Sequence, residues 1–155
     1  MVGRRRPARP RLAGVLAIVT TALLAACSGS EGAGGPAPTP AAPVDGRLTI
    51  RAVDFRFEPP SILVEQGQEV TILLENGGRI LHDFKIDGLE ADVLAAESSG
   101  PLSGEEGELF IGADSGDSAT LRFVPQASGV FTFYCTIDGH RQLGMEGTIT
   151  VEAGP

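Results

Sequence analysis

The sequence predicts an all-β fold, a β-sandwich of about seven or eight strands. The 155 residues include 21 Gly and 11 Pro, many β-branched residues and few helix-forming runs, a composition that favours a turn-rich β protein. From Val44 onward, short apolar or alternating runs are separated by turn residues, which is typical of a sandwich. Two runs, Thr120–Val124 and Val130–Phe133, alternate clearly and are expected to be half-buried antiparallel strands.

The other expected strands follow from the same pattern. The full set is Leu48–Val53, Ser61–Val64, Glu69–Glu75, His82–Ile86, Glu108–Ile111, Ala119–Val124, Gly129–Tyr134 and Thr148–Glu152. Turn residues separate several of them, at Glu58-Pro59-Pro60, Glu65-Gln66-Gly67-Gln68, Asn76-Gly77-Gly78 and Ala127-Ser128-Gly129.

The segment from Asp87 to Ser118 has the weakest pattern. It contains nine acidic residues and no basic residue, and Leu89–Glu97 could form a short helix. Charge runs are usually solvated, so a mobile, solvated excursion is expected here. The alternative is that this segment steers a basic partner by long-range charge.

The N-terminus has the organisation of a secretory signal peptide, expected over residues 1–26. Met1–Arg11 is basic and Leu12–Ala26 is apolar. A spanning helix needs about 20 apolar residues, so this shorter core disfavours a permanent helical anchor. Leu24-Ala25-Ala26-Cys27 resembles the bacterial lipobox, which implies a lipidated Cys27 at the mature N-terminus, with ordinary cleavage nearby as the alternative. The protein is therefore expected to be secreted across the cytoplasmic membrane and lipid-anchored on its outer face.

A linker is expected between this anchor and the folded part. Ser28–Pro43 consists almost wholly of Gly, Ala, Pro and Ser and has no apolar periodicity. The domain organisation expected is a signal peptide over 1–26, a lipidated cysteine and flexible linker over 27–43, and one folded domain over 44–155.

The net charge of the chain indicates which kinds of binding partner are expected. The net charge of the chain is −8, but five of its 12 basic residues lie before Leu12. Removal of residues 1–26 leaves 7 basic and 20 acidic residues, a net charge of −13. Such a surface repels nucleic acid and anionic membranes, so nucleic acid binding is not expected and a basic protein partner is favoured.

The residues that carry chemistry are His82, Cys135, His140 and Met145. The last three have the spacing C-x4-H-x4-M on a predicted loop, and His82 begins a distant strand. A thiolate, two imidazoles and a thioether suit copper in both its oxidation states, whereas zinc rarely recruits methionine. Each residue alone has an ordinary structural explanation, in the core or on the surface. Together they exhaust the histidines of the chain and fit one ligand pattern, which predicts a copper site.

The chain from about Arg47 to Glu152 resembles the cupredoxins, the blue-copper proteins. The resemblance rests on Asn76-Gly77-Gly78 ahead of His82 and on Tyr-Cys-x4-His-x4-Met-x-Gly near the C-terminus, with a loop spacing most similar to the auracyanin, rusticyanin and sulfocyanin members. It implies a Greek-key β-sandwich with one type 1 copper held by the four residues. Many cupredoxins have Asn after the first histidine ligand, to brace the copper loops, where this chain has Asp83.

The function expected is one-electron transfer between a redox protein donor and acceptor, such as a basic cytochrome or oxidase. Phe84, Phe131 and Phe133 are candidates for packing around the ligands, and Leu143 and Gly144 for the border of a docking patch. The alternative is an extracytoplasmic copper-binding module for delivery, storage or sensing. An enzyme is not expected, because no histidine remains for a further copper or a Ser-His-Asp triad.

Overall fold

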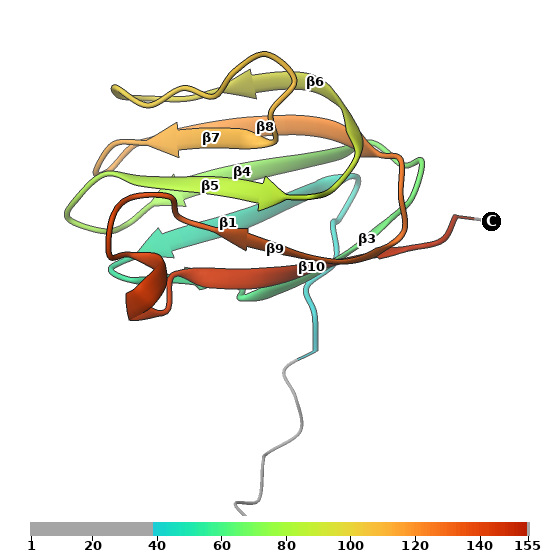
Figure 1. Ribbon diagram of the computed structural model, residues 1–155, viewed down its shortest axis with the longest axis horizontal. Coiled ribbons are helices and arrows are strands. Elements are labelled where there is room, and N and C mark those ends of the chain that lie inside the picture. The colour runs from blue at the N-terminus through green and yellow to red at the C-terminus, as the bar shows by residue number, and fades with distance from the viewer. Residues whose placement is uncertain (1–38, 155) are drawn as a thin grey trace, which may run out of the picture. The chain divides into compact units, whose positions relative to one another are not determined.

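Ten strands form two five-stranded sheets in the part of the chain that the computed structural model describes, residues 39–154 (Figure 1). The strands are β1 (Arg47–Val53), β2 (Arg56–Glu58), β3 (Ser61–Glu65), β4 (Val70–Asn76), β5 (His82–Asp87), β6 (Ala91–Glu97), β7 (Phe110–Ala113), β8 (Ser118–Pro125), β9 (Gly129–Tyr134) and β10 (Glu146–Glu152). A single 3₁₀ turn in this part of the chain, η1 (Arg141–Leu143), precedes β10. No helix in residues 39–154 is long and apolar enough to cross a membrane.

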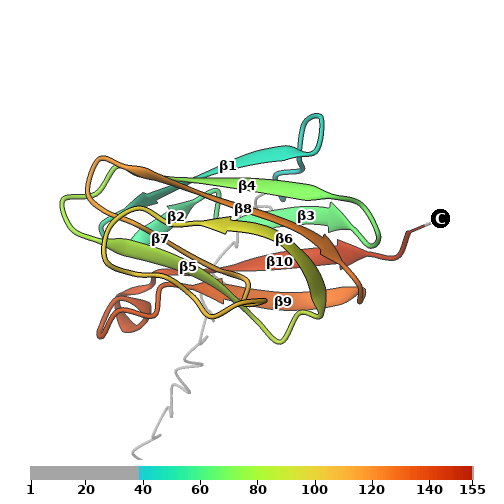
Figure 2. The ribbon, with the colours of Figure 1, turned by 90° about the horizontal axis from the view of Figure 1, so that it is seen from above.

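The sheets are mixed and pack face to face (Figure 2). One has the order β2-β1-β4-β8-β6 and the other β3-β10-β9-β5-β7. β1 runs parallel to β4, and β3 runs parallel to β10, whereas every other paired strand is antiparallel. The β-sandwich predicted from the sequence is confirmed.

All eight expected strands are present, with ends that differ by two residues or fewer, and the described part of the chain adds β2 and β6. The short helix expected over Leu89–Glu97 is wrong. Ala91–Glu97 forms β6 instead, because it pairs antiparallel with β8, and this pairing overrides the helix propensity of its alanines and glutamate. The expected solvated excursion over Asp87–Ser118 is wrong for Ala91–Glu97, which pairs as β6, whereas β7 is the strand expected at Glu108–Ile111.

The signal peptide and Cys27 lie outside the described residues, as does most of the expected linker. Ala41, near the end of that linker, pairs with β3: its N–H donates to the carbonyl of Ser61 at 2.9 Å, and its carbonyl accepts from the N–H of Leu63 at 2.9 Å. The pairing covers part of the outer edge of β3.

The core lies between the two sheets, where alternate residues of the long strands are buried. Phe57, Phe84 and Phe133 meet there with ring centroids 4.9–5.8 Å apart, an edge-to-face and tilted cluster. Phe84 and Phe133 are fully buried, as expected, and Phe131 is half-buried. This cluster lies directly below one end of the sandwich.

That end gathers three connections from distant parts of the sequence. β1 and β9 end there and β5 begins there, on the left in Figure 1. The connections are the β1–β2 turn at Asp54-Phe55, the β4–β5 loop over 77–81, and the β9–β10 loop over 135–145. The predicted ligands lie on the last two or at their edges.

Candidate metal centre

His82 is the first residue of β5 and is fully buried. Its Nε2 lies 3.1 Å from Oδ1 of Asp54, and its Nδ1 has no hydrogen-bond partner. Asn76 holds the loop before it: the Asn76 amide donates to the carbonyls of Ile80 and Ala113, both at 2.8 Å, and accepts from the N–H of Gly78 at 2.9 Å. The histidine therefore enters the site from a braced loop.

Cys135 follows β9, and backbone hydrogen bonds tie its loop to the other predicted ligands. The N–H of Cys135 donates to the carbonyl of Met145 at 3.1 Å, and the N–H of Met145 donates to the carbonyl of His140 at 3.1 Å. Gly144 takes the left-handed conformation (φ 103°) at the end of η1, which glycine adopts without strain, and so lets the chain turn back into β10. The loop is thereby closed on itself.

The structure brings together the donor atoms of three predicted ligands. One atom each from His82, Cys135 and His140 lie within 4.8 Å of one another, and all three residues are buried. Nδ1 of His140 lies 3.3 Å from Sγ of Cys135, and the two imidazole centroids are 5.1 Å apart. Met145 is fully buried, and the backbone hydrogen bonds described above join it to Cys135 and His140.

The burial of these residues and the chemistry of their donor atoms fit a copper ion. A buried polar atom without a partner is rare, and the Nδ1 of His82 is such an atom in the middle of the cluster. One thiol, two imidazoles and a thioether combine soft sulfur donors with harder nitrogen donors. Such a set suits copper better than zinc. A bound ion would satisfy the Nδ1 that the protein leaves without a partner.

His140 is the most exposed of the four predicted ligands, with 7% of its area exposed. The ring of Phe55 packs edge-on against it at 4.9 Å and lies 6.3 Å from the ring of His82. Leu143, in the same loop, is 64% exposed. Asp54 and Phe55 could not be predicted as part of the site, because nothing in a two-residue turn indicates that it lies against a histidine 28 residues after Asp54.

Asp83 braces the cysteine loop. It is fully buried, its Oδ1 accepts from the N–H of Thr136 at 2.6 Å, and its Oδ2 accepts from the Thr136 hydroxyl at 2.8 Å. The bracing expected of the usual Asn is therefore made here by a carboxylate. The difference from Asn is the charge that Asp83 can carry beside Cys135.

Burial changes the pKa values of two predicted ligands, Cys135 and His140. Desolvation raises the pKa of the Cys135 thiol to about 11, so the metal-free thiol is protonated near neutrality. Desolvation lowers the pKa of His140, which favours its neutral form. The hydrogen bond to His82 lowers the pKa of Asp54. A metal ion that binds here must displace the proton of the Cys135 thiol, whereas the His140 imidazole already favours its neutral form.

A family model for copper-binding proteins of the plastocyanin/azurin family matches residues 44–152. Among curated proteins, the copper-resistant cuproprotein CopI of Rubrivivax gelatinosus is 31% identical over 116 residues, 66% of this chain and 66% of that protein. The CopI of Pseudomonas aeruginosa is 26% identical over 146 residues, 74% of this chain and 81% of that protein. The chain thus spans just under two thirds of the length of the first of these relatives.

Solved structures show the same fold. Reduced auracyanin from the photosynthetic bacterium Roseiflexus castenholzii aligns with a TM-score of 0.55 and 22% identity, over 71% of this chain and 98% of that one. Auracyanin B aligns with a TM-score of 0.52 and 19% identity, over 76% of this chain and 92% of that one.

A two-sheet sandwich with a buried His-Cys-His cluster at one end defines a cupredoxin-like copper-binding protein. The chain belongs to the plastocyanin/azurin family of copper-binding proteins. The cupredoxin resemblance seen in the sequence is confirmed.

Proposed function

We propose that the domain holds one copper ion in a type 1 site and carries single electrons between redox partners. His82, Cys135, His140 and Met145 are the proposed ligands. The main support for the proposal is that donor atoms of three buried residues lie within 4.8 Å of one another. One of these residues, His82, has an Nδ1 without a hydrogen-bond partner in the protein.

Rigidity supports electron transfer. A carrier works best when its ligands keep one geometry in both oxidation states, and copper bound here would supply a one-electron couple. The ligand loop is closed by its own backbone hydrogen bonds, and Asp83 ties Thr136 to β5. The Phe57, Phe84 and Phe133 cluster fills the core below. His140, with its small exposed fraction, is the proposed point of electron entry and exit.

A second function is favoured by one observation. The two curated relatives are both named copper-resistant cuproproteins. A protein that stores, delivers or senses copper outside the cytoplasm would use the same donors. It would release copper readily to an acceptor, whereas a carrier keeps its metal in both oxidation states.

The proposed setting is the outer face of the cytoplasmic membrane, with a lipid on Cys27 and residues 27–43 as a tether. The signal-like and lipobox-like sequences support it. The net charge of −8, which becomes more negative without the leader, supports a basic redox protein as donor or acceptor. The proposed role is not enzymatic.

Optical and electron paramagnetic resonance spectra test the proposal. The purified protein is loaded with Cu(II), and both spectra are recorded before and after ascorbate, with Cys135→Ser as the matched control. An electron carrier gives an intense visible thiolate charge-transfer band that ascorbate bleaches reversibly, and it retains copper against a Cu(I) chelator. Rapid loss of Cu(I) to the chelator favours the copper-handling role, and a colourless product contradicts a type 1 site.

A further inference from the structure

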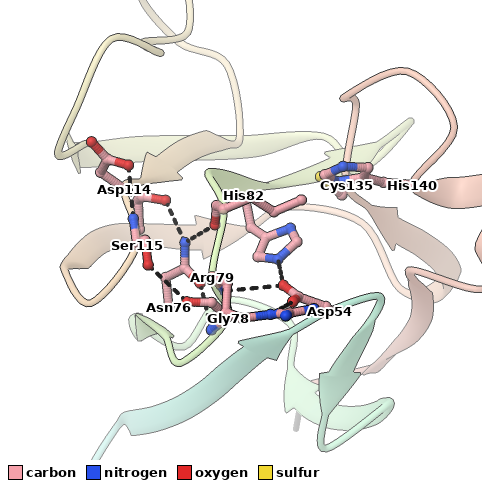
Figure 3. Close-up of polar contacts among 11 residues, drawn as sticks. Asp54, Asn76, Gly78, Arg79, His82, Asp114, Ser115, Cys135 and His140 are labelled. Carbon is pink, nitrogen blue, oxygen red and sulfur yellow. Dashed lines mark hydrogen bonds and ion pairs between the residues drawn. The ribbon is translucent and has the colours of Figure 1, made fainter.

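Asp54 lies against His82 on the side of the ring away from the other ligands. In Figure 3 the His82 ring lies between Asp54 on one side and Cys135 with His140 on the other. The Nε2 to Oδ1 distance is 3.1 Å, His82 is fully buried, and the Asp54 side chain is 17% exposed. The two ring nitrogens therefore have different surroundings: Nε2 faces a carboxylate, and Nδ1 is the buried atom without a partner.

The β4–β5 loop holds the carboxylate in place. Asp54 accepts hydrogen bonds from the Arg79 backbone N–H to Oδ1 and from the Arg79 Nε to Oδ2, both at 3.2 Å. A Cβ added to Gly78 would lie 2.5 Å from Oδ1 of Asp54 and 2.7 Å from Nε2 of His82. The glycine backbone thus closes over the hydrogen bond and leaves no room for a side chain there.

We propose that Asp54 is a positioning residue for the copper ligand His82, which keeps Nδ1 unprotonated toward the metal and favours Cu(II) over Cu(I). An ionised carboxylate can only accept, so it fixes the proton of a neutral imidazole on Nε2. Its negative charge also favours the more positive metal ion. The inference rests on the proposed copper site.

Arg79 moderates this effect. Its side chain is 92% exposed, and its guanidinium is paired with Asp54. The positive charge offsets part of the carboxylate charge felt at His82, although solvent screens an exposed ion pair strongly. Removal of Asp54 and removal of Arg79 should therefore move the reduction potential in opposite directions.

Asp54→Asn is the principal variant. Asparagine can turn its amide NH₂ toward Nε2, which places the imidazole proton on Nδ1 and blocks the ligand atom. We expect Cu(II) affinity to fall about 10- to 100-fold. We also expect the reduction potential to rise, by about 59 mV for each tenfold loss in preference for Cu(II) over Cu(I). Arg79→Gln should lower the potential. The control is Asp45→Asn, the same change at an exposed position before the opposite end of β1.

The ring ¹⁵N spectrum of His82 in the metal-free protein gives a readout independent of copper. The proposal expects a protonated Nε2 and an unprotonated Nδ1 in the starting protein and in Asp45→Asn, and a mixed or reversed tautomer in Asp54→Asn. If Asp54→Asn does not fold, Gly78→Ala should disturb the same hydrogen bond without a change of charge. A protonated Nδ1 in the starting protein, or equal potentials in Asp54→Asn and Asp45→Asn, overturns the proposal. If the protein forms no blue copper site but His82 has the expected tautomer, the proposed function alone is overturned.

Discussion

Burial raises the pKa of the Cys135 thiol in the folded protein. Its pKa of about 11 exceeds the ordinary value of 9.0, so the folded metal-free protein favours the protonated thiol more than the unfolded chain does. The resulting stability is fully present below pH 9.0 and is lost as the pH rises through about 11.

We expect metal-free Cys135→Ala to be less sensitive to alkali than the starting protein. Urea unfolding at several pH values measures this, and the comparison is the slope of stability against pH rather than its absolute value, because the alanine also loses packing. Parallel slopes between pH 9.0 and about 11 would contradict the assignment of the raised pKa to Cys135.

Asp83 offers a separate test of charge beside the copper site. We expect Asp83→Asn to raise the reduction potential, since the amide keeps an acceptor for Thr136 but loses the negative charge of an ionised Asp83. Thr136→Val is the matched variant: it keeps the backbone bond and the charge but leaves Oδ2 without its partner, which should cost about 1–3 kcal/mol in unfolding free energy. An unchanged potential in Asp83→Asn would count against a role for this charge.

Some residues of the centre could be predicted from the sequence and others could not. His82, Cys135, His140 and Met145 are chemically scarce in this chain, so their spacing was informative. Asp54 is one of many carboxylates, and Phe55 one of seven phenylalanines. These two residues reach the site because the turn after β1 packs against the loop before β5. That is a tertiary contact, and no local sequence pattern predicts it.

Among the elements, β10 depends on a close approach at Gly147. A Cβ there would clash with the Phe133 ring of β9 and with the carbonyl of Pro60 before β3. Both neighbours are fixed, one in the aromatic cluster and the other in the backbone. Gly147 lies two residues after Met145, so a displaced β10 would also displace the ligand loop.

Gly147→Ala should therefore lower the unfolding free energy by about 3 kcal/mol and alter the copper spectrum. Gly88→Ala is the control: it meets no atom within 4 Å and bears only the left-handed backbone cost, about 1 kcal/mol, with no spectral change. Denaturant unfolding and the visible spectrum measure the two effects. A normal spectrum in a destabilised Gly147→Ala protein would separate strand packing from the site.

The strands differ in how well the sequence predicted them. β8 alternates between buried and less buried residues over its whole length, so its pattern was visible in the sequence. β6 pairs with β8 through a bulge between Val93 and Ala95. Its sequence is apolar at every position from Val93 to Ala96, so it shows no alternation, and its alanines favour helix when read alone. β2 has three residues, too few for any period to appear.

For the whole molecule, the core between the sheets is made mostly of apolar side chains outside the predicted metal centre. A cluster of buried apolar side chains fills the space between the sheets, and the copper ligands lie at one end of it. The metal-free protein should therefore stay folded, and copper should add stability by binding the native state alone. At a free copper concentration about 1,000 times the dissociation constant, this linkage contributes about 4 kcal/mol.

Thermal and denaturant unfolding with and without copper check this expectation. Cys135→Ser serves as the control, because it should bind copper weakly and gain little stability from it. The expectation would be contradicted if the metal-free protein were unfolded, or if copper stabilised Cys135→Ser as much as the starting protein.

The order of the ligands along the chain has a consequence for biogenesis. His82 is made 53 residues before Cys135, and Met145 comes just before the strand that joins β3 to β9. β3 and β10 pair across 87 residues, as the contact between Ser61 and Thr148 shows. Pairing of strands so distant in sequence is slow, because the entropy of closing the loop is lost before the contact is gained. The four predicted ligands therefore come together only when β10 has paired with β3 and β9, and a chain folded only as far as β9 would offer the ion no complete site.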